Sequence, residues 1–337
     1  MKVIVCDNPG TFTYQEKSKP ASKKEEAIIK IKRIGICGTD LHAFEGTQPF
    51  FSYPRILGHE LSGNIESISG VSGFQEGEPV TFIPYFHCGK CLACRNGLTN
   101  CCSAIRVCGV HIDGGMAEYL SVPTWSLVPG NGLTFDELAL VEPMAIGCHG
   151  VRRAEIKNGE NVLVVGAGPI GLGIIEFARI AGGNVTVMDL NEKRLRFCRE
   201  KLNVTDTINP MESQSVEKML DLTNGEMFSV VIDATGSQRA INESFKYLSH
   251  GSRFVLVGLQ KGDITFSHPE FHKREATLMS SRNATRADFE FVVKCLKEKL
   301  IDTNLFITHR VRFDEVADQF ESWLKPETGV IKAMVEV

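Results

Sequence analysis

The sequence lacks long runs of like charge and long uninterrupted apolar runs. Its 37 basic and 41 acidic residues leave a formal net charge of −4 with no run of like charge, which argues against a nucleic-acid patch or a membrane-binding surface. The longest apolar run, residues 162–175, is broken by four glycines and a proline, so it does not predict a membrane span. The first residues lack the basic, apolar and small-residue order of a signal peptide. We therefore expect a cytoplasmic protein whose partners are small molecules.

The sequence also lacks internal repeats and low-complexity segments, and its 337 residues exceed what one hydrophobic core usually organises. Short β-rich runs punctuated by glycine and proline come first, and strands alternating with helices follow from about residue 160. Such alternation predicts a parallel sheet covered on both faces. We therefore predict an α/β protein with a mostly-β domain over 1–140, a doubly wound six-stranded domain over 141–282, and a segment 283–337 that packs back on the first domain.

A glycine-rich turn directly follows a Val-Leu-Val-Val strand. Gly166, Gly168 and Gly171 have the spacing G-x-G-x-x-G at the start of a helix. This context predicts a dinucleotide site, because the glycines allow a tight turn, close approach of a pyrophosphate and close helix–strand packing. The helix start, which includes Pro169 and Ile170, would attract the phosphates. The alternative is a strand–helix turn without a ligand.

The ends of the following strands complete the expected cofactor site. Asp189 ends the second strand, where an acidic residue accepts hydrogen bonds from the adenosine ribose, and this favours NAD over NADP. Arg194 lies about one turn further on, where it would either meet a phosphate or remain solvated on a helix face. Thr235 ends the fourth strand, and Val257 and Gly258 end the fifth, so all three should line the cofactor cleft.

Eleven cysteines are many for a disulfide framework of this length, and the number is odd. Cys88, Cys91 and Cys94 have metal-ligand spacing, and Cys102 follows after seven intervening residues. Four thiolates from one short loop are typical of a closed structural zinc site. Cys101 lies beside Cys102, and spacing alone does not decide between them; we prefer Cys102.

A second metal site would be assembled across the fold from Cys37, His59 and an acidic residue, with one position left for substrate. Thr39 would then lie beside the substrate oxygen and pass its proton, by way of the cofactor ribose, to His42 and solvent. Asp40 would hold the second nitrogen of His59. Considered alone, Thr39, Asp40 and His42 would instead form a helix cap and its neighbours.

Seven motifs together resemble the zinc-dependent medium-chain alcohol and polyol dehydrogenases along nearly the whole chain. They are GICGTDLH (35–42), GHELSGNI (58–65), the cysteine loop (88–102), DGGMAEY (113–119), EPMA (142–145), GAGPIG (166–171) and DATG (233–236). The resemblance implies a GroES-like catalytic domain interrupted by a Rossmann domain. It also implies two zinc ions per subunit, one catalytic and one structural, and hydride transfer from a zinc-bound alkoxide to NAD, less readily NADP.

The catalytic residues restrict the resemblance to one branch of this family. Glu142 stands where alcohol dehydrogenases have a second cysteine, and Cys37, His59 and Glu60 with Glu142 are similar to the sorbitol and threonine dehydrogenase branch. Whether Glu60 or Glu142 binds zinc directly, or one of them acts through water, stays open at this point. Both count as candidate catalytic residues together with Thr39 and His42.

A further likeness, to bacterial sugar-acid oxidoreductases of the L-galactonate 5- kind, lies in residues 83–102, 109–123 and 269–285. It implies oxidation of a secondary hydroxyl of a polyol or hexonate, with Arg282 and Asn283 as candidate contacts for a carboxylate; an exposed surface arginine is the alternative. Family likeness also implies a homodimer or homotetramer. L-threonine 3-dehydrogenase or sorbitol dehydrogenase is the alternative activity, and a non-catalytic NAD-binding structural protein is the alternative outside enzymes.

Overall fold

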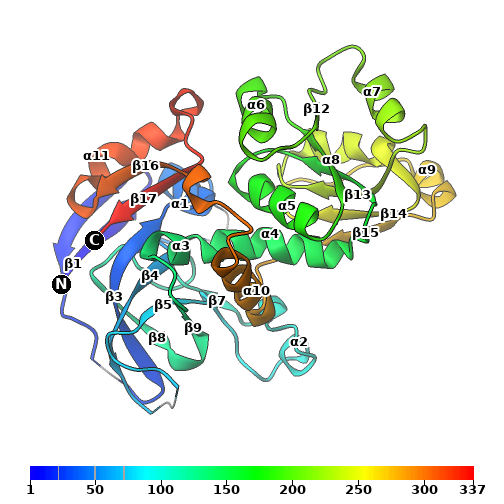
Figure 1. Cartoon of the computed structure of the whole chain (residues 1–337). Helices are drawn as coiled ribbons and strands as arrows, with labels where there is room; N and C mark the ends of the chain where they lie inside the picture. The colour runs from blue at the N-terminus through cyan, green and yellow to red at the C-terminus, as the bar shows by residue number, and fades with distance from the viewer. Residues whose placement is uncertain (22, 49–50, 71–72) are drawn as a thin grey trace. The chain divides into compact units, whose positions relative to one another are not determined.

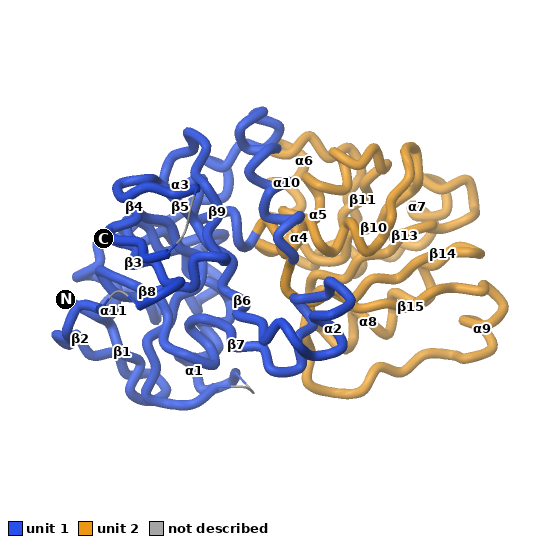
Figure 2. Tube along the Cα trace, turned by 90° about the horizontal axis from the view of Figure 1, so that it is seen from below, with its two compact units in different colours: residues 1–143, 285–337 blue, residues 144–284 orange. Residues whose placement is uncertain are grey.

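The structure is a computed structural model that describes residues 1–21, 23–48, 51–70 and 73–337. The chain forms two compact units, one of residues 1–143 with 285–337 and one of residues 144–284 (Figure 2). Helix α4 (Val141–Ala154) begins in the first unit and continues into the second. The C-terminal segment therefore belongs to the same unit as the N-terminal one.

The first unit is built on an antiparallel-rich sheet in the order β16-β17-β3-β4-β5-β9, with β8 also pairing with β3 (Figure 1). The pairs β1–β2 and β6–β7 stand apart from it. The strands are β1 (Lys2–Asn8), β2 (Thr11–Glu16), β3 (Glu26–Gly35), β4 (Glu60–Ile68), β5 (Pro79–Phe82), β6 (Tyr85–Phe86), β7 (Arg106–Val107), β8 (Tyr119–Pro123), β9 (Leu127–Pro129), β16 (Ile307–Arg312) and β17 (Lys332–Glu336).

Short helices accompany this sheet: α1 (Gly38–Glu45), α2 (Leu92–Arg95), α3 (Phe135–Ala139), α10 (Arg286–Lys297) and α11 (Val316–Phe320). The core of the unit is one cluster that joins apolar side chains from both ends of the chain, such as Ile29, Leu61 and Val335. Burial of this shared cluster explains why the C-terminal segment returns to the first unit.

Strand pairing at the centre of the sheet brings three distant segments together. Gly35, the last residue of β3, lies opposite Glu60, the first residue of β4. Met334 of β17 lies opposite the same glycine on the other side. The residues just after β3, just before β4 and at the start of β17 therefore meet at one end of the sheet.

The second unit contains a six-stranded, wholly parallel sheet in the order β12-β11-β10-β13-β14-β15 (Figures 1 and 2). Successive strands run outward from β10 in one direction and from β13 in the other, so right-handed crossovers place helices on both faces. The strands are β10 (Asn161–Val165), β11 (Asn184–Met188), β12 (Asp206–Ile208), β13 (Phe228–Asp233), β14 (Leu248–Leu256) and β15 (Thr277–Ser280). The helices are α5 (Pro169–Ile180), α6 (Glu192–Lys201), α7 (Ser215–Leu222), α8 (Gln238–Ser244) and α9 (His268–Lys273).

The predicted doubly wound six-stranded sheet and mostly-β partner are thus confirmed. Near the end of the predicted first domain the chain forms two successive helices, α3 and α4. In the part of the chain that is described, no helix is both long and apolar enough to cross a membrane.

Candidate active site and cofactor site

Three side chains of types that can bind a metal converge in the first unit. Cys37 follows β3, and His59 and Glu60 stand at the start of β4; one ligand atom from each lies within 4.8 Å of the others. His59 and Glu60 are buried, while Cys37 is partly exposed. Gly58 precedes His59, and its φ of +93° is accessible to glycine but strained for other residues. Of the four predicted ligands of the catalytic metal, the structure therefore brings Cys37, His59 and Glu60 close together, and Glu142 is not part of this close group.

Asp40 joins the two turns that carry these side chains. Its Oδ2 accepts the N–H of Cys37 at 3.0 Å, and its Oδ1 accepts the N–H of Gly58 at 3.1 Å. Burial raises the pKa of Asp40, while His59 and the two N–H donors oppose that shift. We expected Asp40 to hold the second nitrogen of His59, but His59 Nδ1 lies 3.7 Å from Asp40 Oδ1, which is too long for a hydrogen bond. Asp40 therefore fixes the backbone around the ligands, and it also caps α1.

Glu60 is held from the C-terminal segment. The Lys332 ammonium donates to both Glu60 carboxylate oxygens at 2.6 Å and to the carbonyl of Ile36 at 3.0 Å. Burial lowers the pKa of Lys332, but the charges of Glu60 and Cys37 outweigh it and raise the pKa above its ordinary value. Gly35 makes room for this pair, because a Cβ there would overlap Glu60 Oε2 and lie 3.0 Å from Glu60 Cβ.

Glu142 lies beside this group as a second buried carboxylate. The hydroxyl of Tyr85 donates to Glu142 Oε1, and both side chains are buried. Burial raises the pKa of Glu142 to about 7; the charge of Glu60 adds to that shift, and His59, Tyr85 and Lys332 oppose it. Glu142 is not part of the close group formed by Cys37, His59 and Glu60. The two carboxylates thus differ, since a cation holds Glu60 and a neutral phenol holds Glu142.

These donors fit a catalytic zinc ion. Thiolate, imidazole and carboxylate are the ligands that zinc takes, and three protein ligands leave one position for substrate. His59 Nδ1 faces Asp40 Oδ1 at 3.7 Å, so the other ring nitrogen, Nε2, is the one left to bind a metal. Burial lowers the pKa of His59, but the nearby Asp40 carboxylate outweighs it, and the pKa is raised well above its ordinary value.

The residues of the expected proton path differ in exposure. Thr39 is partly buried in the first turn of α1, and His42 lies one turn on with 62% of its side chain exposed. His42 Nδ1 lies 3.3 Å from Glu45 Oε2 and 3.4 Å from Thr47 Oγ1. His42 is thus open to solvent, as the last member of a proton path must be.

The four predicted cysteines of the loop also come together. Ligand atoms of Cys88, Cys91, Cys94 and Cys102 lie within 4.8 Å of one another, while Cys101 is exposed and outside the group. Backbone N–H groups of Cys94 and Ser103 lower the pKa of Cys91 to about 5, which favours the thiolate that zinc binds. Four cysteines with no open position fit a structural zinc ion.

The glycine turn lies in the second unit at the carboxyl end of β10, where the strand order reverses. A Cβ on Gly166 would lie 2.7 Å from Thr235 Cγ2, and one on Gly171 would overlap the carbonyl of Gly166. At Gly168 the nearest atom, Nη1 of Arg194, is 3.9 Å away. Two of the glycines are therefore needed for packing, and the middle one leaves space for a ligand, as dinucleotide sites require.

Asp189 is directed toward this turn. Its Oδ2 accepts the N–H of Ala167 at 2.7 Å, its Oδ1 accepts the N–H of Asn191 at 2.7 Å, and Arg194 Nη1 lies 3.7 Å from Oδ2. Arg194 is about half exposed. The carboxylate and the guanidinium thus lie together at the expected ribose position. Pro169 is the first residue of α5, at the helix start where the cofactor phosphates are expected.

A buried aspartate organises the neighbouring strand end. Asp233 accepts the hydroxyl of Thr235 at 2.6 Å and the N–H of Gly236 at 3.1 Å. The N–H of Val257 and that of Gly258 bond to the Asp233 carbonyl at 2.9 and 3.1 Å. Burial raises the pKa of Asp233. The predicted cofactor residues after β13 and β14 therefore lie side by side.

The two candidate substrate contacts follow β15 in the second unit. Arg282 is exposed, and Asn283 is partly buried with a φ of +52°. Their assignment to substrate rests on the sequence.

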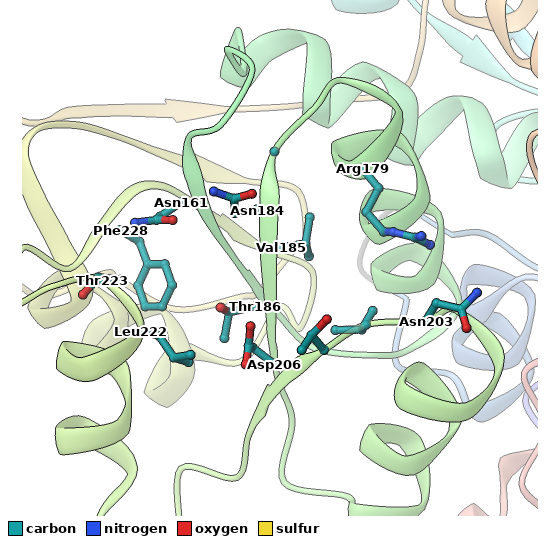
Figure 3. Close-up of a pocket in the computed structure, with 13 residues that line it drawn as sticks. Asn161, Arg179, Asn184, Val185, Thr186, Asn203, Asp206, Leu222, Thr223 and Phe228 are labelled. Carbon is teal, nitrogen blue, oxygen red and sulfur yellow. The ribbon is translucent and has the colours of Figure 1, made fainter.

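A hollow of about 320 Å³ in the second unit lies at the opposite edge of the parallel sheet (Figure 3). Asn161, Asn184, Asp206 and Phe228, the first residues of four neighbouring strands, line it. The glycine turn and Asp189 are at the carboxyl ends of these strands, so this hollow is not the cofactor site.

Sequence reasoning missed two residues of the metal site. Lys332 carried a signal, because it is the single cation in the largely apolar segment VIKAMVEV (330–337), and a buried lysine needs a partner. Tyr85 carried none, since its contact with Glu142 joins residues 57 positions apart.

Comparison with known proteins gives two family matches. Residues 23–132 match the alcohol dehydrogenase GroES-like domain, and residues 169–298 match the zinc-binding dehydrogenase family. The chain is 43% identical to L-galactonate-5-dehydrogenase of Escherichia coli over 336 residues, 99% of this chain and 98% of that one. It is 33% identical to sorbitol dehydrogenase of Halalkalibacterium halodurans over 323 residues, 94% of each chain. A crystal structure from Escherichia coli, described as a short chain alcohol dehydrogenase complexed with NADH, matches with a TM-score of 0.93 and 29% identity over 100% of this chain and 99% of that one.

Proposed function

Because the chain belongs to the zinc-type alcohol dehydrogenase family, we propose that it oxidises a secondary hydroxyl of a polyol or sugar acid, a hexonate such as L-galactonate, to a ketone with NAD. The observation that carries the proposal is the close group of Cys37, His59 and Glu60, with its backbone fixed by Asp40. The similarity to L-galactonate-5-dehydrogenase supports the sugar-acid substrate.

In this proposal Cys37, His59 and Glu60 hold the catalytic zinc, and Glu142 stays beside it. When bound, zinc polarises the substrate oxygen and lowers the pKa of its hydroxyl. Thr39 accepts the hydroxyl proton, and His42, which is exposed, releases it to solvent.

The second unit holds the cofactor that accepts the hydride. Gly166, Gly168 and Gly171 admit the pyrophosphate, and Asp189 accepts the ribose hydroxyls, which favours NAD over NADP. Arg282 and Asn283 contact the substrate carboxylate. A second, structural zinc is held by the four-cysteine group. The protein acts in the cytoplasm as a homodimer or homotetramer.

The proposal is tested by measuring NADH formation at 340 nm on the zinc-loaded protein with L-galactonate, sorbitol and L-threonine, in wild type and Cys37→Ser. We expect activity on L-galactonate above the other two, and loss of at least about a thousandfold in Cys37→Ser, because one zinc ligand is lost. Cys108→Ser changes a buried thiol of the same unit outside the metal groups; it is the control and should stay active. Full activity of Cys37→Ser would refute the zinc mechanism, and a preference for L-threonine would refute the substrate class.

A further inference from the structure

Lys332 is a fully buried cation whose three N–H groups are all used. Two donate to Glu60 Oε1 and Oε2 at 2.6 Å, and the third donates to the carbonyl of Ile36 at 3.0 Å. Only 5% of the Lys332 side chain and none of the Glu60 side chain is exposed. A lysine is rarely buried unless it is paired.

The third hydrogen bond places Lys332 on the backbone that carries a zinc ligand. Ile36 precedes Cys37, and the N–H of Ile36 bonds to the carbonyl of Ala333, the neighbour of Lys332, at 3.0 Å. The start of β17 is thereby attached to the Cys37 turn through both its backbone and its side chain. One ammonium thus connects the segment before Cys37 with Glu60, the residue after His59.

The carboxylate keeps capacity for a metal in this arrangement. Each oxygen of an ionised carboxylate accepts two hydrogen bonds, and Lys332 uses one acceptor site on each. The carboxylate is therefore fixed in orientation, while one Glu60 oxygen lies within 4.8 Å of the Cys37 and His59 ligand atoms. Groups that hold metal-ligating carboxylates in this way commonly control metal affinity.

We propose that Lys332 is the positioning residue of the catalytic metal site, holding Glu60 in register with Cys37 and His59 so that a zinc ion finds three preformed ligands. This role rests on the proposed zinc site. It assigns Glu60 as the third ligand and leaves Glu142, which Tyr85 holds, outside the ligand set. The C-terminal segment, distant in sequence from every ligand, thereby completes the site.

The test measures zinc affinity and not only activity. Zinc is removed stepwise from the full-length protein with a chromophoric chelator. The zinc ion that wild type releases and Cys37→Ser lacks is assigned to the catalytic site. Lys332→Met is expected to raise the zinc dissociation constant of that site by about ten- to a hundredfold, with the four-cysteine site unchanged. Lys325→Met, the same change at an exposed lysine of the same segment, is the control and should leave both sites unchanged.

Lys332→Arg should recover most of the affinity, because a guanidinium also pairs with both carboxylate oxygens. Lys332→Met should add no further loss in a Glu60→Gln background, since Lys332 acts through Glu60. An equal loss in both backgrounds, unchanged affinity, or tighter zinc binding in Lys332→Met would each overturn the proposal. If Lys332→Met does not fold, Lys332→Gln and Lys332→Arg carry the same comparison. Binding of only one zinc by wild type would instead refute the proposed function.

Discussion

Replacing Gly35 by alanine tests whether the metal site depends on the close approach of two strands. The backbone at Gly35 does not need glycine, because its φ is not positive. A Cβ would nevertheless overlap Glu60 Oε2 and lie 3.0 Å from Glu60 Cβ. The change therefore acts on Glu60 through space and not through backbone strain.

The size of the effect follows from the packing. Relief of the overlap requires Glu60 or the strand to move by about 1 Å, since carbon atoms pack at about 3.5–4.0 Å. Such a shift breaks the 2.6 Å contacts with Lys332. Overpacking costs about 1–3 kcal/mol, which lowers the thermal midpoint of a unit of this size by about 2–12 °C. The affinity of the catalytic zinc should fall at the same time by about tenfold or more.

Gly38→Ala is a matched control for this change. Gly38 lies three residues away at the start of α1, and a Cβ there would meet no atom within 4 Å. Calorimetry and chelator competition on both variants give the midpoint and the zinc affinity. Equal midpoints and equal zinc affinities in Gly35→Ala and Gly38→Ala would refute the reasoning, because the overlap would then have no consequence.

Three further changes test other parts of the molecule. Cys102→Ser should remove one zinc ion per chain and lower the thermal midpoint, whereas Cys101→Ser should change neither, since only Cys102 belongs to the four-cysteine group; zinc analysis decides between them. Asp189→Asn should weaken NADH binding by about tenfold, because a charged hydrogen bond is worth about 1.5–3 kcal/mol, and fluorescence titration measures it; unchanged affinity would remove Asp189 from the site. Burial raises the pKa of Asp136, but hydrogen bonds from Arg310 and Arg33 outweigh it and lower the pKa. Asp136→Asn should therefore cost about 1 kcal/mol in urea unfolding at pH 7, a difference that disappears as the pH falls below about 4; a difference that persists in acid would contradict the ion-pair origin.

Local sequence determined the parts of this protein that are contiguous in the chain. The four-cysteine loop and the glycine turn each lie within a short segment, so spacing alone placed their members together, and the structure groups Cys102 with the others while leaving Cys101 exposed. The alternation of strands and helices likewise predicted the six-stranded parallel sheet, because each crossover is a local unit.

Tertiary structure alone decided how the metal-site carboxylates are held. The sequence named Glu60 and Glu142 but did not distinguish them, because their surroundings come from distant strands. Pairing of β3 with β4 and β17 places Glu60 against Gly35 and Lys332, 272 residues away. The fold likewise places Tyr85 of β6 on Glu142 of α4. The physical reason is that charge pairing and burial act through space, so the partner of a buried carboxylate is determined by strand register and not by the residues beside it in the chain.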